Sequence, residues 1–373
     1  MPDTVQMNDI SSDSGRASPD RVGELDLLRF SAALMVVLFH YGFRGYAADN
    51  LSSMPYLAMK PVLKYGFLGV ELFFMISGFV ILMTASSGSL RKFAISRIVR
   101  LYPAYWACCT ITFLTILALG GERFTATFSQ YLINMTMLNE FIGVPSIDGV
   151  YWSLAVELKF YGLVAFILLI RQIHHAQWLL VAWLAATMVT MIFPVSWAIR
   201  WILIADYSTY FIAGATCYLI YSQGASLPRL LIFLAAWLLA IKSSIKYAPG
   251  LERQFKESFD PAVIALLVSS FFVLMLLVSL RKTFGMARKN WVVIGALTYP
   301  LYLLHQKIGY MIFNVAYPGI NMHIVFWATV LFMLLLAYAI HRQVERRFAR
   351  PFKQALERAL DRQFWIGKAR ASR

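Results

Sequence analysis

Charged side chains are scarce in this sequence. Only 14% of its 373 residues are Asp, Glu, Lys or Arg, while 60% are hydrophobic. A soluble globular domain carries about one quarter charged residues, so the composition argues against a soluble fold. Apolar runs long enough to cross a bilayer recur along the whole length, and the short alternating strands of an outer-membrane barrel are missing. The sequence therefore predicts an all-α, polytopic integral membrane protein.

Cysteines are also few, and all three, Cys108, Cys109 and Cys217, lie in apolar stretches. Their spacing matches neither a disulfide framework nor a metal site, so we expect no bound metal and no bound cofactor. A cleavable signal peptide is missing too, because the first 25 residues are polar and the first apolar run is full length. We expect this first run to act as an uncleaved signal anchor.

Acidic residues are outnumbered by basic ones, 19 against 34, which gives a formal net charge of +15. Such an excess would also suit a nucleic-acid-binding protein. In a membrane protein it is explained more simply by loops and tails held at an anionic cytoplasmic face. We therefore expect membrane lipids, and no nucleic acid, among the partners.

About ten apolar segments are predicted to span the membrane. They cover approximately residues 26–43, 66–84, 102–119, 151–170, 178–193, 197–221, 230–245, 262–280, 291–313 and 323–340. Pro103 is expected to open the third span, and a re-entrant or interfacial helix is expected near residues 131–138. Asp206 falls inside the sixth predicted span, where we expect a structural role.

Three parts of the chain are distinguished by composition. Residues 1–24 are expected to form a disordered tail, because they are rich in Asp and Ser and lack an apolar period. Residues 25–345 form the predicted transmembrane domain. Residues 346–373 form a basic tail with helical periodicity, expected to lie along the cytoplasmic surface.

The orientation follows from the basic residues. An even number of spans places both termini on the same side of the membrane. Three basic clusters fall on that side: Arg91, Lys92, Arg97 and Arg100; Arg281, Lys282, Arg288 and Lys289; and Arg342, Arg346, Arg347 and Arg350. Basic loops stay in the cytoplasm, so both termini are predicted to be cytoplasmic.

The first span contains two ionisable residues, Arg29 and His40, which lie 11 residues apart. At about 100° per residue this spacing returns to the same helix face, roughly 16 Å further along the axis. An ionisable side chain inside a membrane is costly and indicates a functional site. The alternative is a pair of bundle-facing residues satisfied by their neighbours.

Depth along the spans brings further ionisable residues to the level of His40. His40 and His305 each lie roughly 20 Å from the cytoplasmic end of their spans, past the midplane. Glu157 lies roughly 9 Å below the outer surface, and Glu71 is at a similar level. A carboxylate such as Glu157 is therefore predicted to orient His40, which would act as a base in acyl transfer. Packing, a helix cap at His305 or a structural ion pair of Glu157 are the alternatives.

Arginines mark the inner half of the membrane. Arg97 and Arg100 project from one side of a helix, and Arg29 lies at a comparable depth. Guanidinium groups bind phosphate in a bidentate manner, so these residues suit a phosphate-bearing donor such as a cytoplasmic acyl-CoA. The acceptor hydroxyl would approach from outside, on a sugar or lipid-linked sugar. Basic residues at a membrane edge can also serve topology alone.

Five motifs in order resemble those of the membrane-bound acyltransferase 3 family, whose members O-acylate bacterial surface polysaccharides and lipo-oligosaccharides. The resemblance extends over residues 24–348. Its motifs are Leu25-Asp26-Leu27-Leu28-Arg29…His40, Gly69-Val70-Glu71-Leu72-Phe73-Phe74-Met75-Ile76-Ser77-Gly78-Phe79, Arg97-Ile98-Val99-Arg100-Leu101-Tyr102-Pro103, Trp152-Ser153-Leu154…Glu157…Phe160-Tyr161, and Tyr299-Pro300-Leu301-Tyr302-Leu303-Leu304-His305.

The resemblance implies an enzyme of the bacterial inner membrane that uses acetyl-CoA or a similar donor, with succinyl as the competing acyl group. His40 is expected to be essential, with Arg29 and Glu157 in the catalytic group. The predicted substrate-binding residues are Arg97, Arg100, Glu71, Tyr161 and His305. The acceptor would be a glycan or lipid-linked sugar, and other polysaccharide-assembly proteins are candidate partners.

Two other classes of protein remain open at this point. A proton-coupled secondary transporter of a small organic solute would use His40, Glu157 and His305 as a proton relay, but it predicts paired internal repeats, which the sequence does not show. A scaffold that only recruits glycan-assembly partners would tolerate the loss of His40 and Arg29.

Overall fold

The computed structural model describes residues 22–283, 285–286 and 289–371, and within these ranges it contains helices and turns but no strand. The all-α prediction is confirmed. Residues 1–21 of the predicted tail and Arg288 lie outside the described residues. The first helix already begins at Gly23, so the end of the predicted tail is helical.

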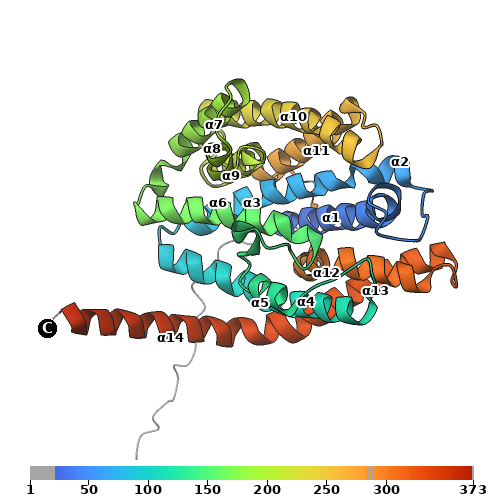
Figure 1. Ribbon diagram of the computed structural model, residues 1–373. Coiled ribbons are helices and arrows are strands. Elements are labelled where there is room, and N and C mark those ends of the chain that lie inside the picture. Colours follow the sequence, from blue (N-terminus) through green and yellow to red (C-terminus); the bar gives the residue numbers. More distant parts are fainter. Residues whose placement is uncertain (1–21, 284, 287–288, 372–373) are drawn as a thin grey trace, which may run out of the picture.

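The long helices form a bundle in which most axes run in roughly the same direction (Figure 1). They are α1 (Gly23–Phe39), α3 (Gly69–Ala85), α4 (Leu90–Leu119), α6 (Trp152–Leu169), α7 (Ala176–Ile192), α9 (Ser208–Gln223), α10 (Leu227–Phe255), α11 (Pro261–Ser279), α12 (Val292–Ala316), α13 (Met322–Ile340) and α14 (Arg346–Ala371). Shorter helical segments are η1 (His40–Ala48), α2 (Lys60–Leu63), η2 (Lys64–Leu68), α5 (Phe128–Asn134), η3 (Asn139–Ile142), η4 (Gly149–Tyr151), η5 (Ile173–His175), α8 (Trp197–Ile202) and η7 (His341–Glu345).

Eight helices of the described chain are long and apolar enough to cross a membrane. The predicted total of about ten also includes α9 and α12, which are not in this set. Helix α9 has 16 residues, and the apolar character of α12 is diluted by His305, Gln306 and Lys307. Most residues of both helices are buried inside the bundle. The polytopic architecture is thus confirmed, while the number of spans stays a prediction.

Two predicted helix boundaries are wrong. Pro103 does not open the third span, because the basic segment before it and the span form one 30-residue helix, α4, with Pro103 inside. Neighbouring helices can satisfy the backbone groups that a proline frees within a membrane bundle. The sixth predicted span is broken into α8 and α9 by a turn in which Ile204 has a φ of 52° and Arg200 pairs with Asp206. Asp206 therefore lies in a turn rather than inside a helix.

Small residues let the central helices approach closely. A Cβ on Gly78 of α3 would lie 2.2 Å from the Phe211 carbonyl oxygen of α9, and one on Gly214 of α9 would lie 1.7 Å from the Met75 carbonyl oxygen. Side chains at either position would force the two backbones apart. This is the packing expected between membrane helices, where small residues at the contact replace a hydrophobic driving force.

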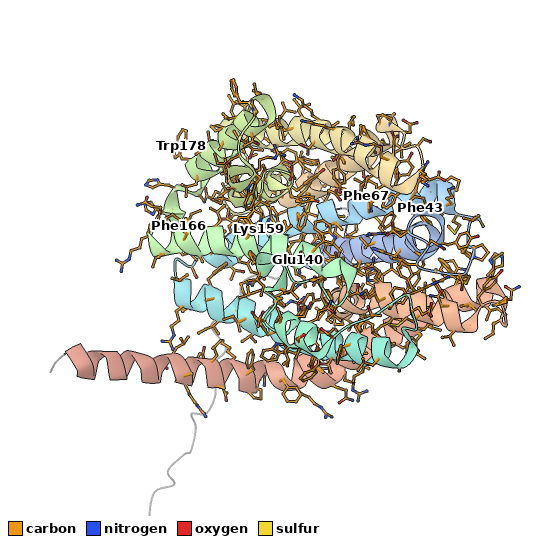
Figure 2. All side chains as sticks on the ribbon, in the orientation of Figure 1. Phe43, Phe67, Glu140, Lys159, Phe166 and Trp178 are labelled. Carbon is orange, nitrogen blue, oxygen red and sulfur yellow. The ribbon has the colours of Figure 1, made fainter. Side chains whose placement is uncertain are left out.

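The outside of the bundle is strongly apolar. Figure 2 shows Phe166 and Trp178 projecting outward from α6 and α7, and their side chains are 57% and 67% exposed. Many other large apolar side chains on α10, α11 and α13 are exposed as well. A soluble protein rarely presents so much apolar surface, whereas contact with lipid explains it.

The basic C-terminal segment is helical, as its periodicity predicts. It continues α13 through η7 into α14, which runs beside α4 and extends past the bundle (Figure 1). Trp106 of α4 meets Phe352 with ring centroids 5.7 Å apart, and Arg91 pairs with Asp361 at 2.7 Å. These contacts hold α14 along α4, and its place at the cytoplasmic surface stays a prediction.

Candidate active site

His40 lies where the first helix changes its form. The α-helical turns of α1 end at Phe39, and the wider π-helical turns of η1 begin at His40 itself. Such π-helical segments are rare and often occur at functional sites. The segment packs tightly, because a Cβ on Gly45 would lie 2.5 Å from the ring of Tyr310 in α12. The π-helical segment that begins at His40 therefore packs closely against α12.

The two histidines meet inside the bundle. The His40 Nδ1 atom lies 3.1 Å from the His305 Nε2 atom and 2.8 Å from the Val36 carbonyl oxygen. Tyr41 donates a hydrogen bond of 2.8 Å to the His305 carbonyl oxygen, which ties the end of the first helix to α12. The depth argument that brought His40 and His305 to one layer agrees with this contact.

The hydrogen-bond network assigns a tautomer to each ring. The His305 Nδ1 atom lies 2.8 Å from the Tyr302 carbonyl oxygen, which can only accept, so Nδ1 carries the proton. In a neutral ring the His305 Nε2 atom is then an acceptor, and His40 must donate to it from Nδ1. The His40 Nε2 atom is left with its lone pair free.

That nitrogen has no hydrogen-bond partner among the described residues, although it is buried. His40 is only 4% exposed, yet it lines a cavity of about 300 Å³. We call this the histidine cavity. Its lining includes Arg44, Glu71, Trp152, Tyr207, Tyr247 and Tyr302. An unpartnered basic nitrogen at the wall of a cavity is suited to accept a proton from a bound ligand.

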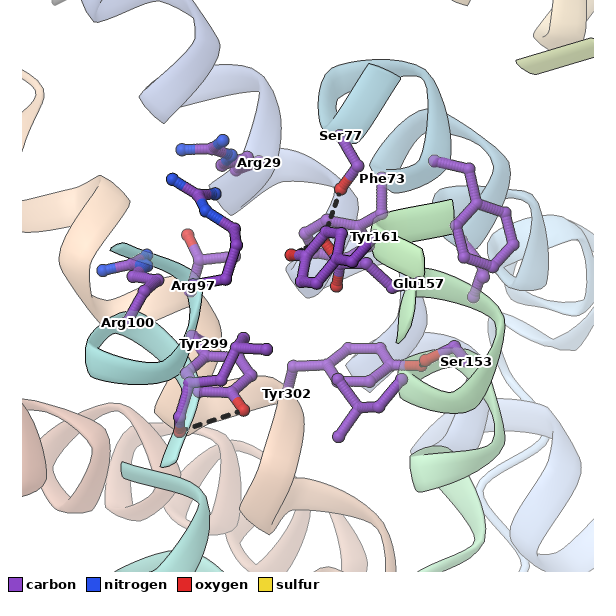
Figure 3. A pocket seen from close by; sticks show the side chains of 15 residues that line it. Arg29, Phe73, Ser77, Arg97, Arg100, Ser153, Glu157, Tyr161, Tyr299 and Tyr302 are labelled. Carbon is purple, nitrogen blue, oxygen red and sulfur yellow. Dashed lines mark hydrogen bonds between the residues drawn. The ribbon is translucent and has the colours of Figure 1, made fainter. Parts of the chain in front are cut away.

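A second cavity of about 100 Å³ holds the predicted arginines. Figure 3 shows the guanidinium groups of Arg29, Arg97 and Arg100 on one side of it, with Glu157 and Tyr161 opposite. We call it the arginine cavity. Arg29 also pairs with Asp26, 3.7 Å away, so the three guanidinium groups are opposed by two carboxylates, Glu157 and Asp26. An excess of positive charge remains, which suits a ligand with phosphate groups.

The hydrogen bonds of the arginine cavity fix Glu157 in place. Ser77 and Tyr161 both donate to its Oε1 atom, at 2.7 Å and 2.6 Å. Arg97 donates from Nη2 to Thr84 at 3.2 Å, but its buried Nε–H has no partner among the described residues. The cavity therefore offers an unused hydrogen-bond donor to a ligand.

The prediction that a carboxylate such as Glu157 orients His40 is wrong. Glu157 belongs to the arginine cavity, and the ring of His40 is held by His305 and the Val36 carbonyl instead. Depth along a span says how far a residue lies from the surface, but not which helix it faces. Glu71, the other predicted carboxylate, does line the histidine cavity.

The two cavities adjoin. Val70 of α3 and Tyr302 of α12 line both of them. The Tyr302 hydroxyl is held by Ser153, 2.7 Å away, and donates to the Val150 carbonyl oxygen at 3.2 Å. Val70 and Tyr302 therefore form the wall between a ligand in the arginine cavity and the cavity that His40 lines.

Asp148 is a residue that sequence reasoning missed. Its carboxylate is fully buried and accepts hydrogen bonds from the backbone N–H of Val150 at 3.2 Å and of Lys307 at 3.0 Å. Burial raises the pKa of Asp148, while these bonds and the Lys307 charge act against the rise. It joins the start of α6 to α12 two residues after His305. Its place before Gly149 at the end of a polar loop was the available signal, since Asp often caps a helix.

No group of three or more His, Cys, Asp or Glu side chains in the described ranges is placed to hold a metal ion. The expectation of a site without metal stays a prediction.

A helical bundle with an apolar exterior, internal cavities and an unpartnered buried imidazole nitrogen defines a polytopic membrane protein with a candidate reactive site. A family model described as an acyltransferase domain matches residues 22–342. The chain belongs to this family, acyltransferase 3, in agreement with the motifs. An acyltransferase family favours acyl transfer over solute transport.

Two curated relatives match part of the chain. Nodulation protein 10 of Rhizobium leguminosarum bv. viciae is 29% identical over 168 residues, which cover 40% of this chain and 44% of that protein. ORF330 of Acidianus two-tailed virus, whose name suggests an acetyltransferase, is 28% identical over 156 residues, or 42% of each chain. The chain thus spans less than half the length of each relative. No solved structure matches it.

Proposed function

We propose that the protein transfers an acyl group, acetyl in the first instance and succinyl as the alternative, from cytoplasmic acyl-CoA to a hydroxyl group of a surface or exported polysaccharide or a lipid-linked sugar. The observation that carries the proposal is the free Nε2 atom of His40, buried and facing a cavity. Membership of an acyltransferase family supports the reaction class.

The donor half of the proposal rests on the arginine cavity. Acyl-CoA carries several phosphate groups, and Arg29, Arg97 and Arg100 supply positive charge and hydrogen-bond donors on one side of that cavity. The thioester at the far end of the donor would point past Val70 and Tyr302 toward His40. The phosphate groups would thereby remain on the cytoplasmic side while the acyl group enters the membrane.

The chemistry uses the lone pair of His40. As the acceptor oxygen attacks the thioester carbonyl, its proton passes to the Nε2 atom of His40. Collapse of the tetrahedral intermediate breaks the carbon–sulfur bond, and the departing CoA thiolate takes the proton back from His40. His305 accepts a hydrogen bond from the His40 Nδ1–H throughout the reaction, so it stabilises the imidazolium that forms. Attack by His40 itself, giving an acyl-histidine, is the competing order of steps.

The proposed location is the bacterial inner membrane, with both termini in the cytoplasm. The apolar exterior and the basic clusters support this orientation. Proteins that assemble or export the polysaccharide are the proposed partners.

Replacing His40 by Ala tests the function. Purified protein in lipid nanodiscs is given acyl-CoA with a radiolabelled acyl group and de-O-acylated glycan from the host cell surface. Wild-type protein should label the glycan, and His40→Ala should lower the rate by about a thousandfold, within the range for loss of a general base. The affinity for acyl-CoA should persist. Equal rates in both proteins would remove His40 from the reaction.

A further inference from the structure

Beside the histidine cavity lies another cavity of about 250 Å³, which we call the side cavity. Phe67, Glu71, Tyr207 and Tyr247 line both. The two cavities therefore adjoin along an aromatic wall that carries one carboxyl group. Together they extend from His40 to the turn between α8 and α9, where Arg200 and Asp206 line the side cavity.

Glu71 supplies the carboxyl group on this wall, and one of its two oxygens remains without a partner among the described residues. Glu71 is only 8% exposed, and its Oε2 atom has no hydrogen-bond partner among the described residues. Burying a carboxyl oxygen without a partner costs free energy. The site is polar and roomy, so a ligand or water is expected to meet that oxygen.

Two of the charged groups around it are paired with other residues, while a third, Lys246 of the side cavity, is exposed. Arg44 donates to Asp49 at 2.6 Å, and Arg200 pairs with Asp206. Two residues that line the histidine cavity carry unpartnered atoms among the described residues, His40 Nε2, which accepts, and Glu71 Oε2, a carboxyl oxygen that accepts when ionised and can donate when protonated. A neutral polyol suits both, because each of its hydroxyl groups can donate and accept a hydrogen bond.

We propose that the histidine cavity and the side cavity together form the acceptor site, in which a sugar ring rests against Tyr207 and Tyr247 and donates one hydroxyl to Glu71 and another to His40. Binding sites of this kind combine aromatic walls with a few placed polar groups. The hydroxyl at His40 is the one acylated, and Glu71 selects which hydroxyl arrives there. Glu71 is thus a specificity-determining residue. This inference rests on the proposed function.

The test is the Glu71→Gln variant, which replaces one acceptor oxygen by an amide donor without changing the shape of the side chain. In the nanodisc assay with de-O-acylated host glycan, we expect the KM for glycan to rise about tenfold. The KM for acyl-CoA should stay within about twofold of wild type, since the arginine cavity is untouched. Tyr247 is half-exposed, so Tyr247→Ala should raise the KM for glycan by less than Glu71→Gln does.

Glu357→Gln is the matched control, because the Glu357 side chain lies on α14, lines neither cavity and pairs with Lys353, 3.9 Å away. It should leave both KM values unchanged. An unchanged KM for glycan in Glu71→Gln, or an equal rise in the KM for acyl-CoA, overturns the assignment of the acceptor site. Wild-type protein that hydrolyses acyl-CoA but labels no glycan overturns the proposed acceptor class itself, which separates the two failures.

Discussion

The arginine cavity and the histidine cavity share a wall but offer opposite hydrogen-bonding chemistry. Among the described residues, the arginine cavity is lined by Arg97, whose unpartnered Nε–H is a donor, while the histidine cavity is lined by His40, whose unpartnered Nε2 is an acceptor, and by Glu71, whose Oε2 is also unpartnered. Unused donors suit the phosphate oxygens of a ligand, and unused acceptors suit hydroxyl groups. The difference suggests that two chemically distinct substrates meet at the shared wall of Val70 and Tyr302.

The largest change in the rate of acyl transfer is expected when the histidine cavity loses its base, His40. His40→Ala should reduce transfer by about a thousandfold while acyl-CoA binding, which depends on the other cavity, is retained. Equilibrium binding of radiolabelled acyl-CoA to the variant checks the second half of this expectation. Loss of donor binding together with transfer would show that the two cavities do not act separately.

Removing the partner of His40 should have the next largest effect. His305→Phe keeps a ring of similar shape but deletes one of the two acceptors that hold the His40 Nδ1–H and orient the ring, the other being the Val36 carbonyl oxygen. We expect kcat to fall by about 10- to 100-fold, as for other groups that orient an imidazole. His305→Gln, whose amide oxygen can accept from His40 Nδ1, should recover part of this loss. A fall of the same size in both variants would indicate a packing role for His305. The KM for acyl-CoA should change little in either.

The opposite cavity is tested by Arg97→Lys. Lysine keeps the charge but lacks the Nε–H and the planar fork, so the KM for acyl-CoA should rise about tenfold with little change in the KM for glycan. Arg91→Lys is the matched control on the same helix, because Arg91 is half-exposed and pairs with Asp361 on α14. Identical kinetics in Arg97→Lys and wild type would argue that the arginines serve only topology.

The smallest effect is expected for replacing Asp148, the buried carboxylate that holds the backbone N–H groups of Val150 and Lys307. Asp148→Asn exchanges one carboxylate oxygen for an amide that cannot accept from a backbone N–H of Val150 or Lys307. We expect a loss of about 1 kcal/mol in the free energy of unfolding, seen as a lower Tm, with rates near wild type. A lower kcat at unchanged Tm would instead give Asp148 a part in positioning α12.

Much of the fold followed from hydrophobic runs, because length and polarity alone identify a helix that can cross a bilayer. Periodicity and depth also brought His40 and His305 together, and they placed Arg29, Arg97 and Arg100 in a common group. These arguments use only the rise and turn of a helix, which any helical sequence obeys.

What the sequence could not supply was the set of neighbours around each helix. Glu157 was expected beside His40, but it faces Arg97 and Arg100, since the rotation and packing of α6 depend on contacts with α3 and α4. The turn near Ile204 escaped notice because the residues around it are apolar and continue the run. The π-helical turn at His40 leaves no mark in the sequence pattern.

The free lone pair of His40 can be measured directly. Protein labelled with ¹⁵N-histidine in nanodiscs at neutral pH gives separate NMR signals for protonated and unprotonated ring nitrogens, and loss of signals in His40→Gln assigns those of His40 among the six histidines. We predict a proton on Nδ1 and none on Nε2, and the Val36 carbonyl oxygen should keep the proton on Nδ1 in His305→Phe as well. A His40 ring protonated at Nε2 in the wild-type protein would contradict the account.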